Sequence, residues 1–255
     1  MPLEIVTIPC RTDNYAFLLH DPQAGQTALI DAPAAGPIAS QLGDRGWGLD
    51  EIWITHHHSD HIDGVDTLRQ LFGSTVLGAA ADAHRLPALD VALSDGDTHT
   101  FAGHDVQVMD VSGHTVGHIA FYVPDAAAAF TADSLMACGC GRVFEGTFDQ
   151  MWASLEKLAA LPPETKICSG HEYTAANARF AATIEPDNPD LMSRIRSIAA
   201  AREAGVATVP STLSLELATN PFLRARLPHV KAAIGMGNTT DAEAFGEIRR
   251  RKDAF

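Results

Sequence analysis

Short apolar runs separated by polar turns fill the first two-thirds of the chain, a pattern that is typical of β-strands. The runs predict strands over residues 3–8, 15–20, 27–31, 51–57, 74–79, 105–111, 119–123 and 128–133. Asp95-Gly96, within LSDGDTHTF, predicts a hairpin turn between two strands. Segments 64–72 and 148–161 predict helices, and Pro162-Pro163 ends the second of them. Antiparallel strand pairs mixed with helices predict sheets covered by helices, in an α+β or α/β layered domain.

The segment after His171 differs from the rest by its helical periodicity and its many alanines. Helices are expected within 172–186, 188–205 and 240–255, whereas 212–224 predicts a connecting loop. Thr240 is a suitable N-cap for the last helix, and Glu243, three residues later, allows a capping box. We therefore predict a first domain over residues 1–171 and a small helical domain over 172–255.

Composition and charge restrict the class of protein. The chain has 255 residues, of which 46% are hydrophobic, so it can bury a substantial core. No apolar run reaches a membrane-spanning length, and MPLEIVTIPC lacks the basic start and apolar block of a signal peptide. A net charge of −14 argues against a nucleic-acid partner. We therefore expect a cytoplasmic protein with neither a membrane nor a nucleic acid as partner.

The cysteines also fit that compartment. Cys10, Cys138, Cys140 and Cys168 have no spacing that suggests a disulfide framework, so reduced thiols are expected. Cys138 and Cys140 are either a metal-binding pair or small residues of a loop, and we favour the loop because no second Cys/His pair lies at zinc-finger distance.

Four histidines and two aspartates lie close together in THHHSDHIDG, which directly follows the expected strand EIWI. On an extended chain, His56 and His58 face one way and His57 the other. Asp60 and His61 come from the turn that opens the next helix, where a second ion could be held. The alternative is a solvated polar loop. We favour metal binding, because these groups lie between a hydrophobic strand and a helix and are costly there unless something neutralises them.

Two metal ions need more ligands than this loop provides. His114 follows a strand and a glycine turn, Asp133 lies at a strand end, and His171 follows another strand. Functional groups are often held at such strand ends on a rigid scaffold. Asp31, at the end of LID, either accepts a hydrogen bond from a ligand histidine or is only a turn residue before a proline-containing loop.

These motifs resemble a known family. HHHSDH, followed by His114, Asp133 and His171, resembles the metallo-β-lactamase superfamily of binuclear metal hydrolases over nearly the whole chain. CGCGRVFEGT, GHEYT, NPFLR and RRRKDAF resemble its glyoxalase II branch, the hydroxyacylglutathione hydrolases. The resemblance implies an α+β fold, an αββα sandwich followed by a small C-terminal helical domain that binds substrate.

The resemblance also implies a site and a reaction. One divalent ion would be bound by His56, His58 and His114, the other by Asp60, His61 and His171, and Asp133 would bridge them. Zinc is the expected metal, with iron or manganese as alternatives. Asp60 and Asp133 are the expected catalytic residues. A metal-bridged hydroxide would hydrolyse S-(2-hydroxyacyl)glutathione thioesters, converting S-D-lactoylglutathione to D-lactate and glutathione in the second step of methylglyoxal detoxification.

The substrate carries carboxylates, so an acidic protein needs a local cationic patch to bind it. The resemblance places Arg142, Phe144, Tyr173, Arg249 and Lys252 around the substrate. Arg249 and Lys252 are three residues apart and share a helix face, although the cations of RRRK also suit a helix C-terminus. Many relatives have lysine at position 142, tyrosine at 144 and glycine at 63, so Arg142, Phe144 and Asp63 are departures.

Other functions are compatible with parts of this pattern. A persulfide dioxygenase would use a single iron, but the complete second set of donors argues against it. A lactonase or a nuclease of the same superfamily is a further alternative, and the negative charge weakens the nuclease. A metal-storage or regulatory module is the non-enzymatic alternative. We favour the thioesterase, acting as a monomer on a small-molecule acylglutathione.

Overall fold

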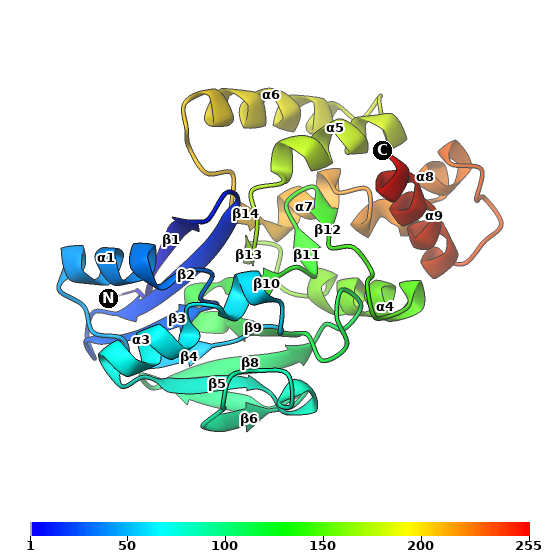
Figure 1. Cartoon of the computed structure of the whole chain (residues 1–255). Coiled ribbons are helices and arrows are strands. Elements are labelled where there is room, and N and C mark those ends of the chain that lie inside the picture. The colour runs from blue at the N-terminus through cyan, green and yellow to red at the C-terminus, as the bar shows by residue number, and fades with distance from the viewer. Residues whose placement is uncertain (1) are drawn as a thin grey trace. The chain divides into compact units, whose positions relative to one another are not determined.

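The computed structural model describes residues 2–255 (Figure 1). They divide into two compact units. The first unit comprises the chain up to Asp110 together with Gly117–Ala132, and the second comprises Val111–Val116 together with Asp133–Phe255. The boundaries of these units differ from the expected boundary between a domain over 1–171 and one over 172–255. That expected boundary stays a prediction. Among residues 2–255, no helix combines the length and the apolarity needed to cross a bilayer.

The first sheet of the first unit combines an antiparallel meander with parallel strands. Its order follows the sequence: β1 (Glu4–Cys10), β2 (Asn14–Asp21), β3 (Gln26–Ile30), β4 (Glu51–Trp53), β5 (Thr75–Ala79) and β6 (Val91–Leu93). Strands β1 to β3 pair antiparallel, and β3 to β6 pair parallel. Two helices, α1 (Ala35–Arg45) and α3 (Val65–Phe72), bury Ile38, Leu42, Val65 and Leu68 in one cluster with the apolar residues of the sheet. The helices therefore cover one face of this sheet.

The other face of that sheet packs against a second, antiparallel group of strands in the same unit. These are β7 (Thr98–Phe101), β8 (His104–Asp110), β9 (Ile119–Val123) and β10 (Ala128–Ala132). Trp53 contacts Phe101 and Phe121, with ring centroids 5.5 and 5.2 Å apart, and Phe17 contacts Phe130 at 5.8 Å. These aromatic pairs belong to the core between the sheets, to which β9 contributes Phe121.

The second unit is mainly helical. Its strands are short: β11 (Leu135–Met136), β12 (Gly139–Cys140), β13 (Lys166–Ser169) and β14 (Ser211–Thr212). Its helices are α4 (Phe148–Ala159), α5 (Thr174–Ile184), α6 (Pro189–Glu203), α7 (Leu213–Thr219), α8 (Pro228–Ala233) and α9 (Asp241–Ala254). Phe245 of α9 packs against Phe148, Trp152 and Phe222, which joins three segments in one aromatic core. The capping box of Thr240 and Glu243 is confirmed.

Three expectations about elements were wrong. Asp95-Gly96 does form a turn, with Gly96 at φ 85°, but β6 pairs with β5 and β7 pairs with β8, so the turn leads from one sheet to the other and makes no hairpin. The expected loop 212–224 contains α7, because Leu213 and Glu216 share a buried helix face. The strand expected over 51–57 ends at Trp53, since the histidines that follow do not continue the sheet pairing.

Candidate metal centre

The loop after β4 brings the clustered histidines of the first unit together. The ring atom His56 Nε2 lies 3.2 Å from His58 Nδ1. His57 turns to the other side and donates from Nδ1 to Asp82 Oδ2 at 3.0 Å. The alternation predicted for an extended chain is therefore confirmed: two imidazoles face one another, while the third is held by a buried carboxylate.

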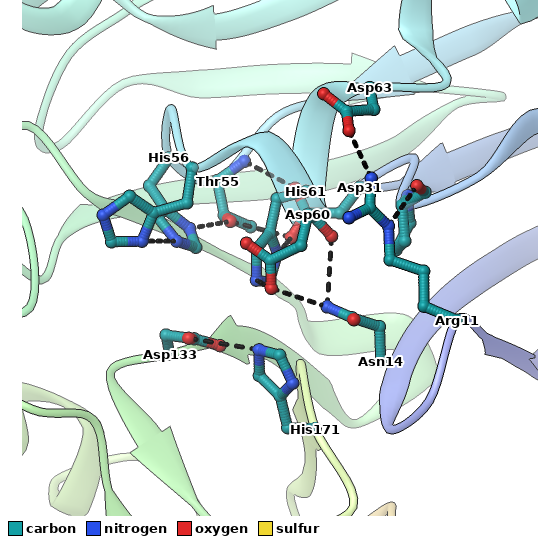
Figure 2. Close-up of polar contacts among 12 residues, drawn as sticks. Arg11, Asn14, Asp31, Thr55, His56, Asp60, His61, Asp63, Asp133 and His171 are labelled. Carbon is teal, nitrogen blue, oxygen red and sulfur yellow. Dashed lines mark hydrogen bonds and ion pairs between the residues drawn. The ribbon is translucent and has the colours of Figure 1, made fainter.

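The following short helix α2 (Ser59–Ile62) supplies Asp60 and His61 to the same cluster, whose contacts are drawn in Figure 2. His61 Nδ1 donates to Asp31 Oδ2 at 2.7 Å, which directs its Nε2 toward the cluster, 3.8 Å from Asp60 Oδ2. Asn14 Nδ2 donates to Asp60 Oδ2 at 2.9 Å and to the Asp60 main-chain oxygen at 3.1 Å. The ring of His61 and the carboxylate of Asp60 are both oriented by hydrogen bonds.

Asp31 is the buried acceptor on which this arrangement depends. It follows β3 with φ at 56°, in the left-handed region that L-residues seldom adopt. Its Oδ1 accepts from the Thr55 main-chain N–H at 2.9 Å, and its Oδ2 accepts from the Thr55 hydroxyl at 2.8 Å as well as from His61. Of the two interpretations of Asp31, the hydrogen bond to a candidate ligand histidine is the one that the structure supports.

The second unit brings the three remaining candidates together. Asp133 Oδ2 lies 3.3 Å from His171 Nε2 (Figure 2) and 3.4 Å from His114 Nε2. The three side chains are buried. His114 Nδ1 donates to the Arg142 main-chain oxygen at 2.8 Å, so Nε2 is its ligand-type nitrogen. A Cβ at Gly141 would lie 2.0 Å from the Asp133 main-chain oxygen, so only glycine fits there.

These distances test whether the residues suit a metal ion. Tetrahedral coordination with bonds of about 2.0–2.1 Å places neighbouring ligand atoms about 3.3 Å apart. The pairs within each unit are 3.2, 3.3, 3.4 and 3.8 Å apart, and all their atoms are imidazole nitrogens or carboxylate oxygens. The chain thus has clusters of histidine and aspartate that are able to bind metal ions.

Three expected substrate contacts lie near the donors of the second unit. The Tyr173 ring stacks on His171, with centroids 4.7 Å apart and planes 6° apart. The Phe144 ring lies 5.3 Å from His114 and is 62% exposed. The Arg142 side chain is exposed and its Nε lies 3.8 Å from Asp253 Oδ1. Exposed aromatic and cationic groups therefore adjoin two candidate ligand histidines.

The two cations expected on the last helix differ in their surroundings. Burial, and then repulsion from Arg249, Arg179 and Arg142, lowers the pKa of Lys252 to about 8. Arg249 is only 3% exposed. Its Nη1 donates to the Cys140 main-chain oxygen at 3.0 Å, and its Nη2 donates to Asp253 at 2.9 Å. Substrate binding by Arg249 stays a prediction, and its guanidinium is already engaged with the protein.

Sequence reasoning missed several supporting residues. Asn14, Thr55 and Asp82 hold the first histidine cluster, but no spacing in the sequence distinguishes them from ordinary loop residues. Asp63, one of the noted departures, pairs with Arg11 at the surface (Figure 2).

The four cysteines are buried and free, and burial raises the pKa of Cys10 and Cys140 to about 11 and that of Cys138 to about 12. None of these thiols is poised to ionise near neutrality.

Comparisons with known proteins agree with this geometry. Residues 12–171 match the family model described as metallo-beta-lactamase superfamily, and residues 172–255 match the model described as hydroxyacylglutathione hydrolase C-terminus. Proteins named hydroxyacylglutathione hydrolase from Roseobacter denitrificans and Ruegeria pomeroyi are 65% and 62% identical over all of both chains.

A solved structure extends the comparison to the fold. The crystal structure of ETHE1 from Myxococcus xanthus matches with a TM-score of 0.67 and 22% identity, covering 100% of this chain and 99% of that one. At that identity the likeness concerns the fold alone. Together with the two family models, it confirms the expected α+β class: a metallo-β-lactamase fold followed by a helical C-terminal region. With the family models and the full-length relatives, it follows that the chain belongs to the hydroxyacylglutathione hydrolases, the glyoxalase II branch of the metallo-β-lactamase superfamily.

Proposed function

We propose that this protein hydrolyses S-(2-hydroxyacyl)glutathione thioesters, converting S-D-lactoylglutathione to D-lactate and glutathione in the second step of methylglyoxal detoxification. The observation that carries the proposal is the 65% identity, over both full chains, to a relative named hydroxyacylglutathione hydrolase. The clusters of imidazole and carboxylate described above are consistent with it, because they suit a metal-dependent hydrolase.

The proposed site holds two divalent ions, with zinc as the first choice and iron or manganese as alternatives. His56, His58 and His114 would hold one ion, Asp60, His61 and His171 would hold the other, and Asp133 would bridge them. In support, the donor atoms within each unit have ligand-like separations, and Asp133 directly follows Ala132, the last residue of β10. When bound, such ions supply Lewis acidity, which lowers the pKa of water toward 7 and stabilises negative charge on a carbonyl oxygen.

The protein's own contribution is to orient the donors before the substrate arrives. Asp31 fixes the ring of His61 through Nδ1, and the Arg142 carbonyl does the same for His114, so that both histidines offer Nε2. Asn14 fixes the carboxylate of Asp60. Such hydrogen bonds reduce the reorganisation that catalysis would otherwise require.

The helical region over 172–255 is proposed to bind the glutathione part of the substrate, together with Arg142 and Phe144. Lys252 and Arg142 attract its carboxylates, which the overall charge of −14 would otherwise repel. Tyr173 and Phe144 provide aromatic surface beside His171 and His114. The leaving group is a thiolate, which departs without a dedicated general acid, so the site needs none.

A substrate panel tests the proposal. Purified protein loaded with zinc, iron or manganese is expected to release free thiol and D-lactate from S-D-lactoylglutathione. Acyl-homoserine lactones, phosphodiesters and glutathione persulfide with oxygen serve as competing substrates. A fully metallated protein that leaves the thioester intact, or that cleaves one of the others faster, contradicts the proposal.

We further propose that the protein acts as a monomer in the cytoplasm. The four free, buried cysteines support a reducing compartment. Light scattering at micromolar protein concentration should give the mass of one chain, 27.1 kDa. A mass that stays at twice this value on dilution contradicts the monomer.

A further inference from the structure

The β11–β12 hairpin, residues Leu135–Cys140, connects Asp133 to Arg142 within the second unit. At its base, the Gly141 N–H donates to the Ser134 oxygen at 3.1 Å, and the Arg142 oxygen accepts from His114 Nδ1 at 2.8 Å. Asp133 and Arg142 each lie two residues beyond the hairpin, joined to it by Ser134 and Gly141. We therefore expect a shift of its strands to move the Asp133 carboxylate and the acceptor that orients His114.

The main chain of this hairpin is bound by side chains from the helical region. Asn220 Nδ2 donates to the Met136 and Gly139 oxygens at 3.1 and 2.9 Å. Asn177 Nδ2 donates to the Ala137 oxygen at 3.1 Å, and Glu216 Oε2 accepts from the Cys138 N–H at 2.8 Å. With Arg249 bound to the Cys140 oxygen, each residue from Met136 to Cys140 has a main-chain group held in this way.

The side chains that hold the hairpin are themselves fixed. Glu216 and Asn220 are completely buried, and Asn177 is 6% exposed. Glu216 Oε1 accepts from the buried guanidinium of Arg194, and Asn220 Oδ1 accepts from the Phe222 N–H at 3.0 Å. Glu216 and Asn220 are each bonded at more than one point, so this part of the buried network has few alternative arrangements.

Close packing leaves the hairpin little freedom to move. A Cβ at Gly139 would lie 2.4 Å from Asn177 Nδ2, so the amide reaches the backbone only because residue 139 is glycine. Cys138 is held at φ 55°, a conformation that a non-glycine residue keeps only when its surroundings impose it. The network around Glu216 supplies that constraint.

We propose that Asn177, Glu216 and Asn220 are positioning residues for the metal centre. They fix the β11–β12 hairpin and through it the Asp133 carboxylate and the His114 ring. The inference rests on the proposed function, and it gives the helical region a second role beside substrate binding, which is to help retain the metal ions.

Two substitutions and one matched control test this role. Asn220→Ala removes both carbonyl contacts, and Asn177→Ala removes one. The control, Asn188→Ala, removes an amide that donates to the Ala218 oxygen at 3.0 Å in the same helical region but does not touch the hairpin. Zn²⁺ affinity is measured by competition with a chromogenic chelator, alongside thermal unfolding of the metal-loaded protein and kcat and KM for the thioester.

We expect both hairpin variants to bind Zn²⁺ about 10–100-fold more weakly, with a fall in kcat and little change in KM. Asn188→Ala should unfold at a lower temperature while keeping the wild-type Zn²⁺ affinity. Should Asn220→Ala fail to fold, Asn177→Ala decides the matter, because it removes a single hydrogen bond.

Wild-type Zn²⁺ affinity and kcat in folded hairpin variants overturn the positioning role. An equal loss of affinity in Asn188→Ala overturns it as well, because the effect would then be general destabilisation. Zn²⁺ affinity is measured without substrate, so an inactive but fully metallated wild type contradicts the proposed function and leaves this test intact.

Discussion

In the first unit, the expected donors come from one stretch of the chain, His56–His61, whereas in the second unit they come from positions 114, 133 and 171. The local group is oriented by side chains: Asp31 holds His61 and Asn14 holds Asp60. The dispersed group is oriented by backbone, through the Arg142 carbonyl and the β11–β12 hairpin. Donors close in sequence need only correct side-chain direction, while donors far apart need a rigid main chain to bring them together.

The largest expected effect comes from Asp133, which faces both histidines of the dispersed group. Asp133→Ala should lose metal and turnover together, with kcat lowered about 1000-fold or more, the factor for roughly 4 kcal/mol. Metal content per chain and steady-state kinetics measure both. If the variant retained two ions and a near wild-type kcat, the Asp133 carboxylate would not be needed for metal binding or turnover, which contradicts its assigned role.

Asp31→Asn tests how the donors of the local group are oriented. The amide cannot accept from His61 and Thr55 as the carboxylate does, so the ring loses its fixed orientation. We expect metal affinity or kcat to fall about 10–100-fold. Asp82→Asn is the matched control, because Asp82 is also buried and holds a histidine, His57, that faces away from the other two. Equal losses in the two variants would contradict the assignment.

The sequence predicted the local group well. The spacing of His56 and His58 on an extended chain determines that they face one way, and the structure confirms it. His114, Asp133 and His171 were recognisable only as chemistry at strand ends, because their meeting depends on tertiary contacts. The strand pairing around the β6–β7 turn was predicted wrongly and helix α7 was missed for a related reason: sheet partners and buried helix faces are decided by distant residues.

Lys252 predicts a pH effect on substrate binding. Burial lowers its pKa to about 8, so the free enzyme loses this positive charge as the pH rises through that value. The ratio kcat/KM should therefore fall above pH 8, and Lys252→Ala should raise KM about 10-fold at pH 7, as for a lost charge-assisted hydrogen bond. Lys252→Arg should remove the fall above pH 8. A wild-type profile that is flat from pH 7 to 10 contradicts this role.

The lowered pKa of Lys252 also makes the free energy of unfolding depend on pH. Between about pH 8 and the ordinary lysine value of 10.5, the unfolded chain binds more protons at this residue than the folded chain. The contribution of Lys252 to the free energy of unfolding therefore rises with pH over this window. Denaturant unfolding at a series of pH values, compared with Lys252→Met, measures it, and a contribution that falls with pH contradicts the burial of the amine.

Arg142 should give the smallest effect, although its main-chain oxygen supports His114. Substitution leaves that oxygen in place and removes only an exposed guanidinium, so Arg142→Ala should raise KM about 2–5-fold with kcat and metal content unchanged. Arg250→Ala, which removes an exposed partner of Glu247 on α9, is the control and should change neither. A loss of metal in Arg142→Ala would mean that the side chain, too, positions the dispersed group.

The most direct test of the central claim is a metal titration followed by thioester hydrolysis. Metal-free protein is supplied with Zn²⁺ in steps, and bound metal and turnover of S-D-lactoylglutathione are recorded for each sample. If the local and dispersed donors together hold two bridged ions, activity should reach its plateau at two ions per chain. Full activity at one ion per chain, or two bound ions without hydrolysis, would contradict the account.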